Sequence, residues 1–200
     1  MSDFVDKLKL KEQAEEDLFF ARRERELVAG VRRFRSDAGG GRLKVVSGGQ
    51  TGVDRAALDA AAELGLDLGG GCPAGRLAED GVIPGRYPLV ETPDRAAAQR
   101  TDWNVRDSDA KLILHRGAPI GGTRLTMDLA RRHGRPLLLR DLGTAVDARA
   151  IADWLGVNRV QILNCAGPRE SESPGITHQS AQLLRQVFAL WKSTPVHPAD

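Results

Sequence analysis

From residue 43 onward, short apolar runs alternate with longer segments whose apolar residues recur at helical spacing, and this alternation constrains the fold most strongly. Apolar runs of this kind are typical of parallel strands that helices cover on both faces. The sequence therefore predicts an α/β fold of three layers with a mostly parallel sheet. We expect strands near residues 43–47, 66–68, 111–115, 136–140 and 160–164, and helices near residues 53–64, 123–133, 147–155 and 176–191.

The first 37 residues differ in composition from the rest of the chain. They contain 9 Lys or Arg and 9 Asp or Glu residues, with apolar residues loosely at helical spacing between them. We expect a charged N-terminal helix over residues 1–37. A glycine-rich linker (38–42), the α/β domain (43–192) and a tail (193–200) follow it.

Composition excludes several classes of protein. No apolar run reaches the ~18 residues of a membrane span, and the net charge of +2 does not favour a nucleic-acid partner. Cys72 and Cys165 are too few for a disulfide framework and lack the spacing of a zinc site. We expect a cytoplasmic protein with no membrane partner.

Glycine-rich segments follow three of the expected strands. The first is Ser47-Gly48-Gly49-Gln50-Thr51-Gly52, the second is 117–123 and the third is 167–171. The carboxyl ends of parallel strands meet at one edge of a sheet, where N–H groups and helix dipoles favour an anion. We expect these segments to bind a phosphate-bearing small molecule, through Ser47, Gly48, Gly49, Gln50, Thr51, Gly52, Gly121, Gly122, Thr123, Arg169, Glu170 and Ser171.

The segment 69–93 holds many glycines and prolines, which predicts a long ordered loop. Its charged residues Arg76, Glu79 and Asp80 are expected to form a wall of the pocket, and Asn104 a further polar contact. Cys72 could be a thiolate ligand to a metal, but a lone cysteine beside proline more often packs in a core. We therefore expect no metal ligands from the protein.

Several motifs, in order, carry a family resemblance: residues 47–59, Cys72-Pro73-Ala74-Gly75-Arg76-Leu77-Ala78-Glu79-Asp80-Gly81, 87–92, 100–109, 121–123 and 166–171. They resemble the molybdenum carrier family of the SLOG group, which also includes lysine-decarboxylase-like and cytokinin-activating proteins. The resemblance implies a Rossmann-like fold and a molybdenum cofactor as ligand. A nucleotide, the ligand of many SLOG relatives, remains the alternative. One departure is Gly71, where the family pattern predicts tryptophan.

Two alternative functions remain open. Cytokinin-activating relatives cleave an N-glycosidic bond with the help of a glutamate in the motif Pro-Gly-Gly-x-Gly-Thr-x-x-Glu. In this chain Thr126 stands in the glutamate position, and threonine is no general base near neutral pH. This favours a non-catalytic binding protein, although Glu79 or Asp80 could replace the missing carboxylate.

The second alternative is an interaction protein that acts through its N-terminal helix. That helix weakly resembles the inhibitory helix of the mitochondrial ATP synthase inhibitor protein. Phe19 and Phe20 are costly to expose on so charged a segment. We expect a second subunit of a homo-oligomer, or another protein partner, to cover them.

Overall fold

A computed structural model describes residues 42–193. Its centre is a five-stranded parallel sheet in the order β2-β1-β9-β7-β8, which confirms the predicted Rossmann-like α/β fold. The five strands are β1 (Lys44–Val46), β2 (Asp67–Gly69), β7 (Ala110–His115), β8 (Leu137–Asp141) and β9 (Ile162–Ala166).

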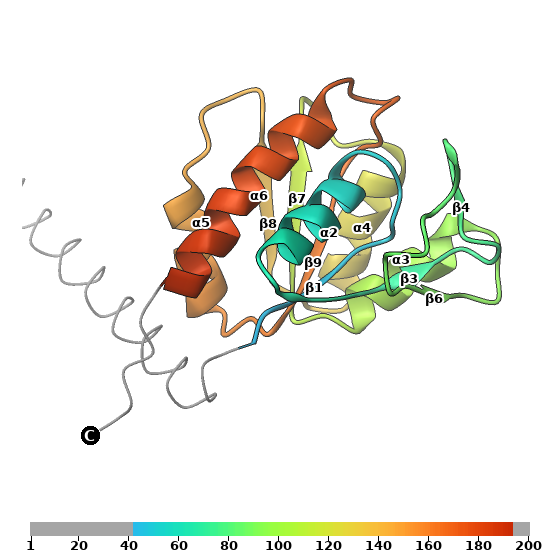
Figure 1. The fold of residues 1–200 in the computed structure, drawn as a ribbon, viewed down its shortest axis with the longest axis horizontal. Coiled ribbons are helices and arrows are strands. Elements are labelled where there is room, and N and C mark those ends of the chain that lie inside the picture. The colour runs from blue at the N-terminus through green and yellow to red at the C-terminus, as the bar shows by residue number, and fades with distance from the viewer. Residues whose placement is uncertain (1–41, 194–200) are drawn as a thin grey trace, which may run out of the picture.

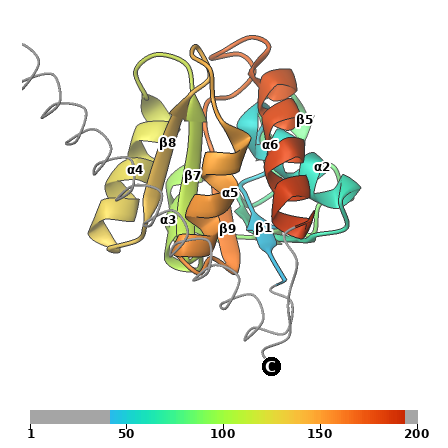
Figure 2. The same cartoon turned by 90° about the vertical axis from the view of Figure 1, so that its left-hand side faces the viewer.

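Within residues 42–193, the five helices α2 to α6 form the two outer layers (Figures 1 and 2). One face of the sheet carries α2, α5 and α6, and the other carries α3 and α4. The helices are α2 (Val53–Glu63), α3 (Ala97–Arg106), α4 (Gly121–Arg132), α5 (Ala148–Val157) and α6 (Ile176–Ser193).

The main core lies between the sheet and the layer of α2, α5 and α6. In this core Leu112 and Leu163 on neighbouring strands pack with Leu155 and Phe188 from the helices, all fully buried. Because the middle strands are covered on both faces, their sequences are almost continuously apolar, which made them visible in the sequence.

One helix was not expected from the sequence. Helix α3 buries Thr101, Asn104 and Val105 on its inner side, and two of these three residues are polar. Without an apolar stripe, the segment carries no helical periodicity that a reader of the sequence could detect.

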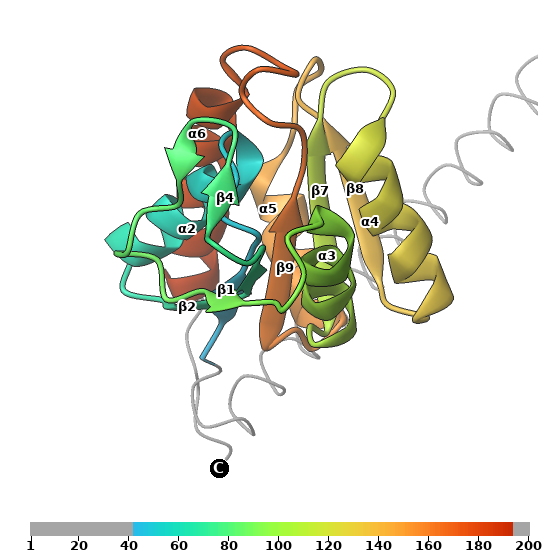
Figure 3. The ribbon, with the colours of Figure 1, turned by 90° about the vertical axis from the view of Figure 1, so that its right-hand side faces the viewer.

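The loop expected over residues 69–93 contains four very short strands and folds as an arm beside α2 and α3 (Figure 3). Strands β3 (Gly71–Cys72) and β6 (Val90–Glu91) pair in parallel. Strands β4 (Leu77–Ala78) and β5 (Gly81–Val82) form a hairpin. A small cluster of Leu58, Cys72, Ile83, Tyr87 and Leu89 attaches the arm to α2.

The predicted N-terminal helix and the tail after residue 193 lie outside the described residues. Within residues 42–193, no helix is both long and apolar enough to span a bilayer.

Candidate functional site

The three glycine-rich segments leave the same edge of the sheet from neighbouring strands. Strand β9 lies between β1 and β7 and is parallel to both. The chain continues from β1 through α2 to β2 on one side, and from β7 through α4 to β8 on the other. The segments therefore meet where the strand order reverses, which is where open α/β sheets bind ligands.

The first glycine segment is occupied by a carboxylate of the protein itself. Asp54, in the first turn of α2, is 4% exposed, and its Oδ2 lies 3.4 Å from the backbone N of Gln50. The backbone N–H of Gly48 also donates to this carboxylate. The structure thus accounts for two N–H groups that the sequence assigned to a ligand.

Asp54 pairs with Arg100 of α3, since its Oδ2 lies 3.5 Å from Arg100 Nη1. Burial raises the pKa of Asp54, while the positive charge of Arg100 opposes that shift. Arg100 Nε is also buried, and no hydrogen-bond acceptor reaches it within residues 42–193.

Two glycines of this segment are required by contacts within the protein. A Cβ at Gly48 would lie 1.9 Å from Arg100 Nη1, and a Cβ at Gly52 would lie 2.2 Å from the carbonyl oxygen of Pro168. Gly52 also has φ of +77°, which side chains disfavour. Both glycines let neighbouring segments approach, so they shape the site from within.

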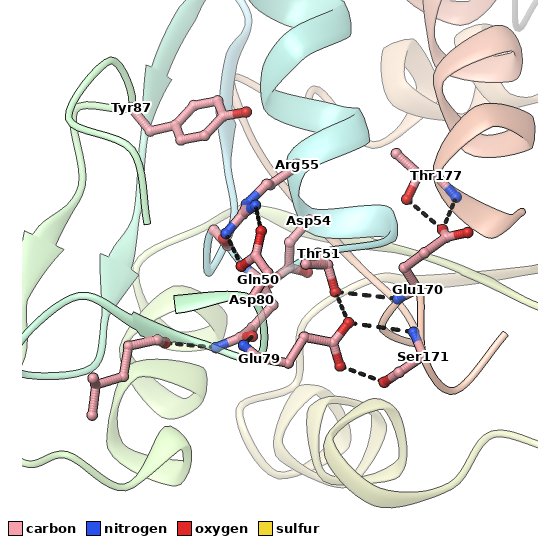
Figure 4. Close-up of polar contacts among 12 residues, drawn as sticks. Gln50, Thr51, Asp54, Arg55, Glu79, Asp80, Tyr87, Glu170, Ser171 and Thr177 are labelled. Atoms are coloured by element: carbon pink, nitrogen blue, oxygen red, sulfur yellow. Dashed lines mark hydrogen bonds and ion pairs between the residues drawn. The ribbon is translucent and has the colours of Figure 1, made fainter. Parts of the chain in front are cut away.

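The turn of the β4–β5 hairpin joins the first and third glycine segments (Figure 4). The Glu79 carboxylate accepts hydrogen bonds from the hydroxyls of Thr51 and Ser171, and from the Ser171 backbone N at 3.3 Å. The hydrogen bonds from Ser171 and Thr51 lower the pKa of Glu79. Thr51 Oγ1 in turn accepts from the backbone N of Glu170 at 3.2 Å. The sequence predicted these four residues at the site, and the structure brings them together.

Two further predicted residues hold the same hairpin in place. Gln50 Nε2 donates to the carbonyl oxygen of Leu77 at 2.8 Å. Asp80 forms an ion pair with Arg55 of α2, with Nη2–Oδ1 at 2.8 Å, and the hydrogen bonds from Arg55 lower the pKa of Asp80. Glu79 and Asp80 are therefore engaged within the protein, and neither lines the cavity described below.

The third glycine segment leads into α6. The Glu170 carboxylate accepts from the backbone N and hydroxyl of Thr177, at 3.0 and 2.5 Å, and from the backbone N of Gly175. These hydrogen bonds lower the pKa of Glu170 and cap the start of the helix. The backbone N of Arg169 donates to Glu172 at 3.0 Å.

The second glycine segment leaves the start of α4 open. Gly121 and Gly122 are exposed, a Cβ at either would meet nothing within 4 Å, and no side chain caps the helix. Helix N-termini leave N–H groups free and carry a partial positive charge, so they attract anions.

A cavity of about 70 Å³ lies between this helix start, α3 and the other two segments. It brings together polar groups that the sequence predicted and others that it did not. Its polar and glycine lining comprises Gln50, Asp54, Arg100, Thr101, Gly122, Thr123, Thr126, Gly167, Arg169 and Glu172.

Sequence reasoning missed Asp54, Arg100, Thr101 and Glu172. Asp54 lies in the first turn of α2, where the helix dipole alone is enough to explain an acidic residue. Arg100 and Thr101 lie on α3, the helix that the sequence did not reveal.

Three predicted site residues serve the scaffold. The Arg76 guanidinium donates to four backbone carbonyls of the arm, those of Ile83, Pro84, Tyr87 and Leu89. The Asn104 side chain accepts from Gly71 N at 2.6 Å and donates to Gly71 O at 3.1 Å. Ser47 Oγ donates to the carbonyl oxygen of Cys165 at 2.7 Å. None of the three lines the cavity.

Cys72 lies in the apolar cluster under the arm, and burial raises the pKa of its thiol. A protonated, buried thiol is a poor metal ligand. Within residues 42–193, no three His, Cys, Asp or Glu side chains gather as a metal site would require.

Comparisons with known proteins agree with this architecture. The model of the "Circularly permutated YpsA SLOG family" matches residues 45–188. A crystal structure from Syntrophus aciditrophicus SB, named as that of a proposed molybdenum carrier protein, superposes with a TM-score of 0.70 at 40% identity. That match covers 74% of this chain and 95% of the other.

A more distant similarity is to phosphopantetheine adenylyltransferases of Brucella ovis and Brucella suis, at 26% identity over 114 residues. This similarity covers 55% of the chain and 65% of those relatives, so the chain spans less than two thirds of their length. The family match and the structural match together show that the chain belongs to the circularly permuted YpsA family of SLOG proteins, and is a ligand-binding protein of that group.

Proposed function

We propose that this protein binds a phosphate-bearing small molecule at the start of α4, without transforming it, and that the molecule is a molybdenum cofactor. The single observation that carries the proposal is the exposed, uncapped N-terminus of α4 beside a cavity lined by Arg100 and Arg169. A phosphate there would meet free N–H groups, a helix dipole and the guanidinium-bearing Arg169, whereas Arg100 is already paired with Asp54.

The residues fit one part of the cofactor. The phosphate would be held by the N–H groups of Gly121 and Gly122, with the Thr123 hydroxyl nearby. A cavity of about 70 Å³ holds little more than a phosphate group, so the pterin would lie outside it, where the Ile120 side chain is 67% exposed. The metal would stay on the dithiolene of the pterin, which supplies its sulfur ligands.

The structural neighbour supports the molybdenum cofactor through its name. A nucleotide is the second candidate ligand, since the adenylyltransferase relatives are named for phosphate-bearing molecules. A hydrolase remains a second candidate function because Asp54, whose pKa burial raises, lines the cavity together with Glu172. Against a hydrolase, Thr126 stands where the hydrolase motif requires a carboxylate, and its hydroxyl donates to the carbonyl oxygen of Gly122 at 3.0 Å.

Native mass spectrometry of the full chain, purified anaerobically from its own host, tests the proposal. We expect an adduct with the mass of the molybdenum cofactor, and one molybdenum atom for each occupied chain. The adduct should be lost in Gly122→Asp, whose carboxylate would occupy the helix start and repel a phosphate.

The matched control is Gly85→Asp, which adds the same charge at an exposed glycine of the arm with no atom within 4 Å of its Cβ. An adduct that Gly122→Asp retains would refute the site. A nucleotide adduct that only Gly122→Asp loses would keep the site and refute the molybdenum cofactor. Release of free base from nucleoside monophosphates, abolished by Asp54→Asn, would refute the non-catalytic function.

A further inference from the structure

A second and larger cavity, of about 350 Å³, lies away from the glycine segments. It is bounded by the face of β1, the beginning of β9, the C-terminal half of α3 and the arm, and it opens to solvent. The residues that shape it are Lys44, Val46, Gly71, Val90, Trp103 and Ile162. Its volume falls within the range of about 300–1,000 Å³ that is usual for small-molecule sites.

The walls of this cavity are mainly apolar. Val46 and Ile162 come from the sheet, Val90 from the arm and the half-buried Trp103 from α3. Val90 is 64% exposed, so this side of the cavity is open to solvent. An indole beside aliphatic side chains favours a flat aromatic ring over a chain of hydroxyl groups.

The polar groups at the cavity indicate the charge of its ligand. The Asn104 amide is already bound to the backbone of Gly71. The Arg106 guanidinium is bound to the Asp107 carboxylate, at 2.6 and 2.7 Å. Lys44 is the lining cation that has no carboxylate partner within residues 42–193. Among the described residues, its ammonium is therefore left for an anion.

Gly71 keeps the cavity open. A Cβ built at this glycine would meet Asn104 and Arg100 atoms at 3.6 to 3.8 Å, which is ordinary van der Waals contact, and its φ is not positive. The backbone thus accepts a side chain at position 71, and a large one would take up the space beside it.

We propose that this cavity is a second binding site, which takes a flat heteroaromatic anion with its ring against Trp103 and its negative group at Lys44. The site is independent of the proposed phosphate site, because the two cavities share no lining residue. Its ligand class is defined by the ring and the charge, and a fused two-ring carboxylate is the simplest member.

Fluorescence titration of the full chain with pterin-6-carboxylate tests this site, with neutral pterin as the uncharged probe. We expect Gly71→Trp to raise the dissociation constant about tenfold or more, because the indole fills the cavity. Gly85→Trp is the matched control and should bind as the wild type does. Val90→Glu should weaken the binding of pterin-6-carboxylate, because the two negative charges repel each other. Since Val90 is exposed, this substitution should leave the fold intact.

Lys44→Met should raise the dissociation constant of pterin-6-carboxylate about fivefold, which is the order of one solvent-exposed ion pair. The dissociation constant of neutral pterin should not change. The phosphate-site variant Gly122→Asp should bind both probes normally. Normal binding of pterin-6-carboxylate by both Gly71→Trp and Val90→Glu would overturn the proposal. The proposal would also be overturned if only Gly122→Asp lost the binding of pterin-6-carboxylate, or if the wild type did not bind it at millimolar concentration.

Discussion

Asp54 of α2 and Arg100 of α3 form a buried ion pair directly beside the first glycine segment, with Oδ2 and Nη1 3.5 Å apart. The side chain of Asp54 is 5% exposed and that of Arg100 14%. The pair connects the helix that follows β1 to a helix on the opposite face of the sheet, and it lines the cavity where we place the ligand. It therefore links the stability of the fold to the shape of the site.

Arg100→Met should destabilise the protein by about 3 kcal/mol near neutral pH, because it leaves the Asp54 carboxylate buried without its partner. Urea denaturation at pH 7 measures this loss. In the double variant with Asp54→Asn, part of the loss should be recovered, since no buried charge remains. Losses that simply add in the double variant would show that the two groups do not interact.

Glu79→Gln should loosen the β4–β5 hairpin, because a neutral amide accepts weaker hydrogen bonds from Thr51 and Ser171 than a carboxylate does. Hydrogen exchange should become faster at residues 77–82 and stay unchanged in β7 and β9. Since the hydroxyl donors lower the pKa of Glu79, the contribution of its carboxylate is present at neutral pH and is lost as acid protonates it. Wild-type exchange in the hairpin should accordingly rise at acidic pH, after correction for the intrinsic rate. A hairpin with unchanged protection in Glu79→Gln would contradict this role.

The free energy of unfolding should increase as the pH rises from about 7 toward 10.5, because of Lys111 in β7. Burial, with a smaller effect of the Arg135 charge, lowers the pKa of Lys111 from 10.5 to about 7. Between these values folding releases a proton, so alkali favours the folded state, and below about 7 the full cost of the buried charge remains. Thermal unfolding between pH 6 and pH 10 measures this effect.

Lys111→Met should abolish that dependence and stabilise the protein most at pH 6. This holds despite the loss of the hydrogen bonds from Nζ to the carbonyl oxygen of Ser108 at 3.0 Å and to its hydroxyl at 2.5 Å. Lys192→Met, at an exposed position of α6, serves as the control and should leave the dependence in place. An equal effect of both substitutions at every pH would disprove the assignment to Lys111.

Asn104→Ala should cost about 1–3 kcal/mol of stability, the penalty for leaving the buried backbone N–H and C=O of Gly71 without partners. Asn104→Asp should also destabilise, since a carboxylate cannot donate to the Gly71 carbonyl. Denaturant titration of both variants distinguishes this scaffold role from ligand contact. A stable Asn104→Ala variant that had lost only ligand affinity would restore the interpretation made from the sequence.

The sequence predicted the fold well where buried apolar residues recur at the regular spacing of a strand or helix. Strand β7 (Ala110–His115) and helix α2 (Val53–Glu63) were predicted within one residue at each end, because an apolar run and an alanine-rich segment identify them. Helix α3 was missed because Asn104 and Thr101 occupy its buried side, where their partners are backbone groups distant in sequence or a turn away. The order β2-β1-β9-β7-β8 depends on contacts that no local pattern records.

The candidate site shows a similar division. Gln50, Thr51 and Ser171 were predicted because polar residues next to glycines follow the strands, and Glu79 because it adds charge to the loop over 69–93. The four residues do meet in space. Arg76 was predicted at the pocket because a charged residue in a loop suggests a ligand, whereas in the structure its guanidinium donates to carbonyls of the arm. Asp54 was missed for the opposite reason. It is a buried acid whose carboxylate accepts the backbone N–H of Gln50, a group that was expected to be free for a ligand.

The most direct test of the central claim is an amide NMR titration of the full chain with guanosine monophosphate and with molybdopterin. The account predicts that both ligands shift the amide signals of Gly121 and Gly122 most strongly, because the phosphate binds their N–H groups. Guanosine, which lacks the phosphate, should leave these signals in place. Shifts confined to Ser47–Gly52, or shifts at Gly121 and Gly122 that guanosine reproduces, would contradict a phosphate site at the start of α4.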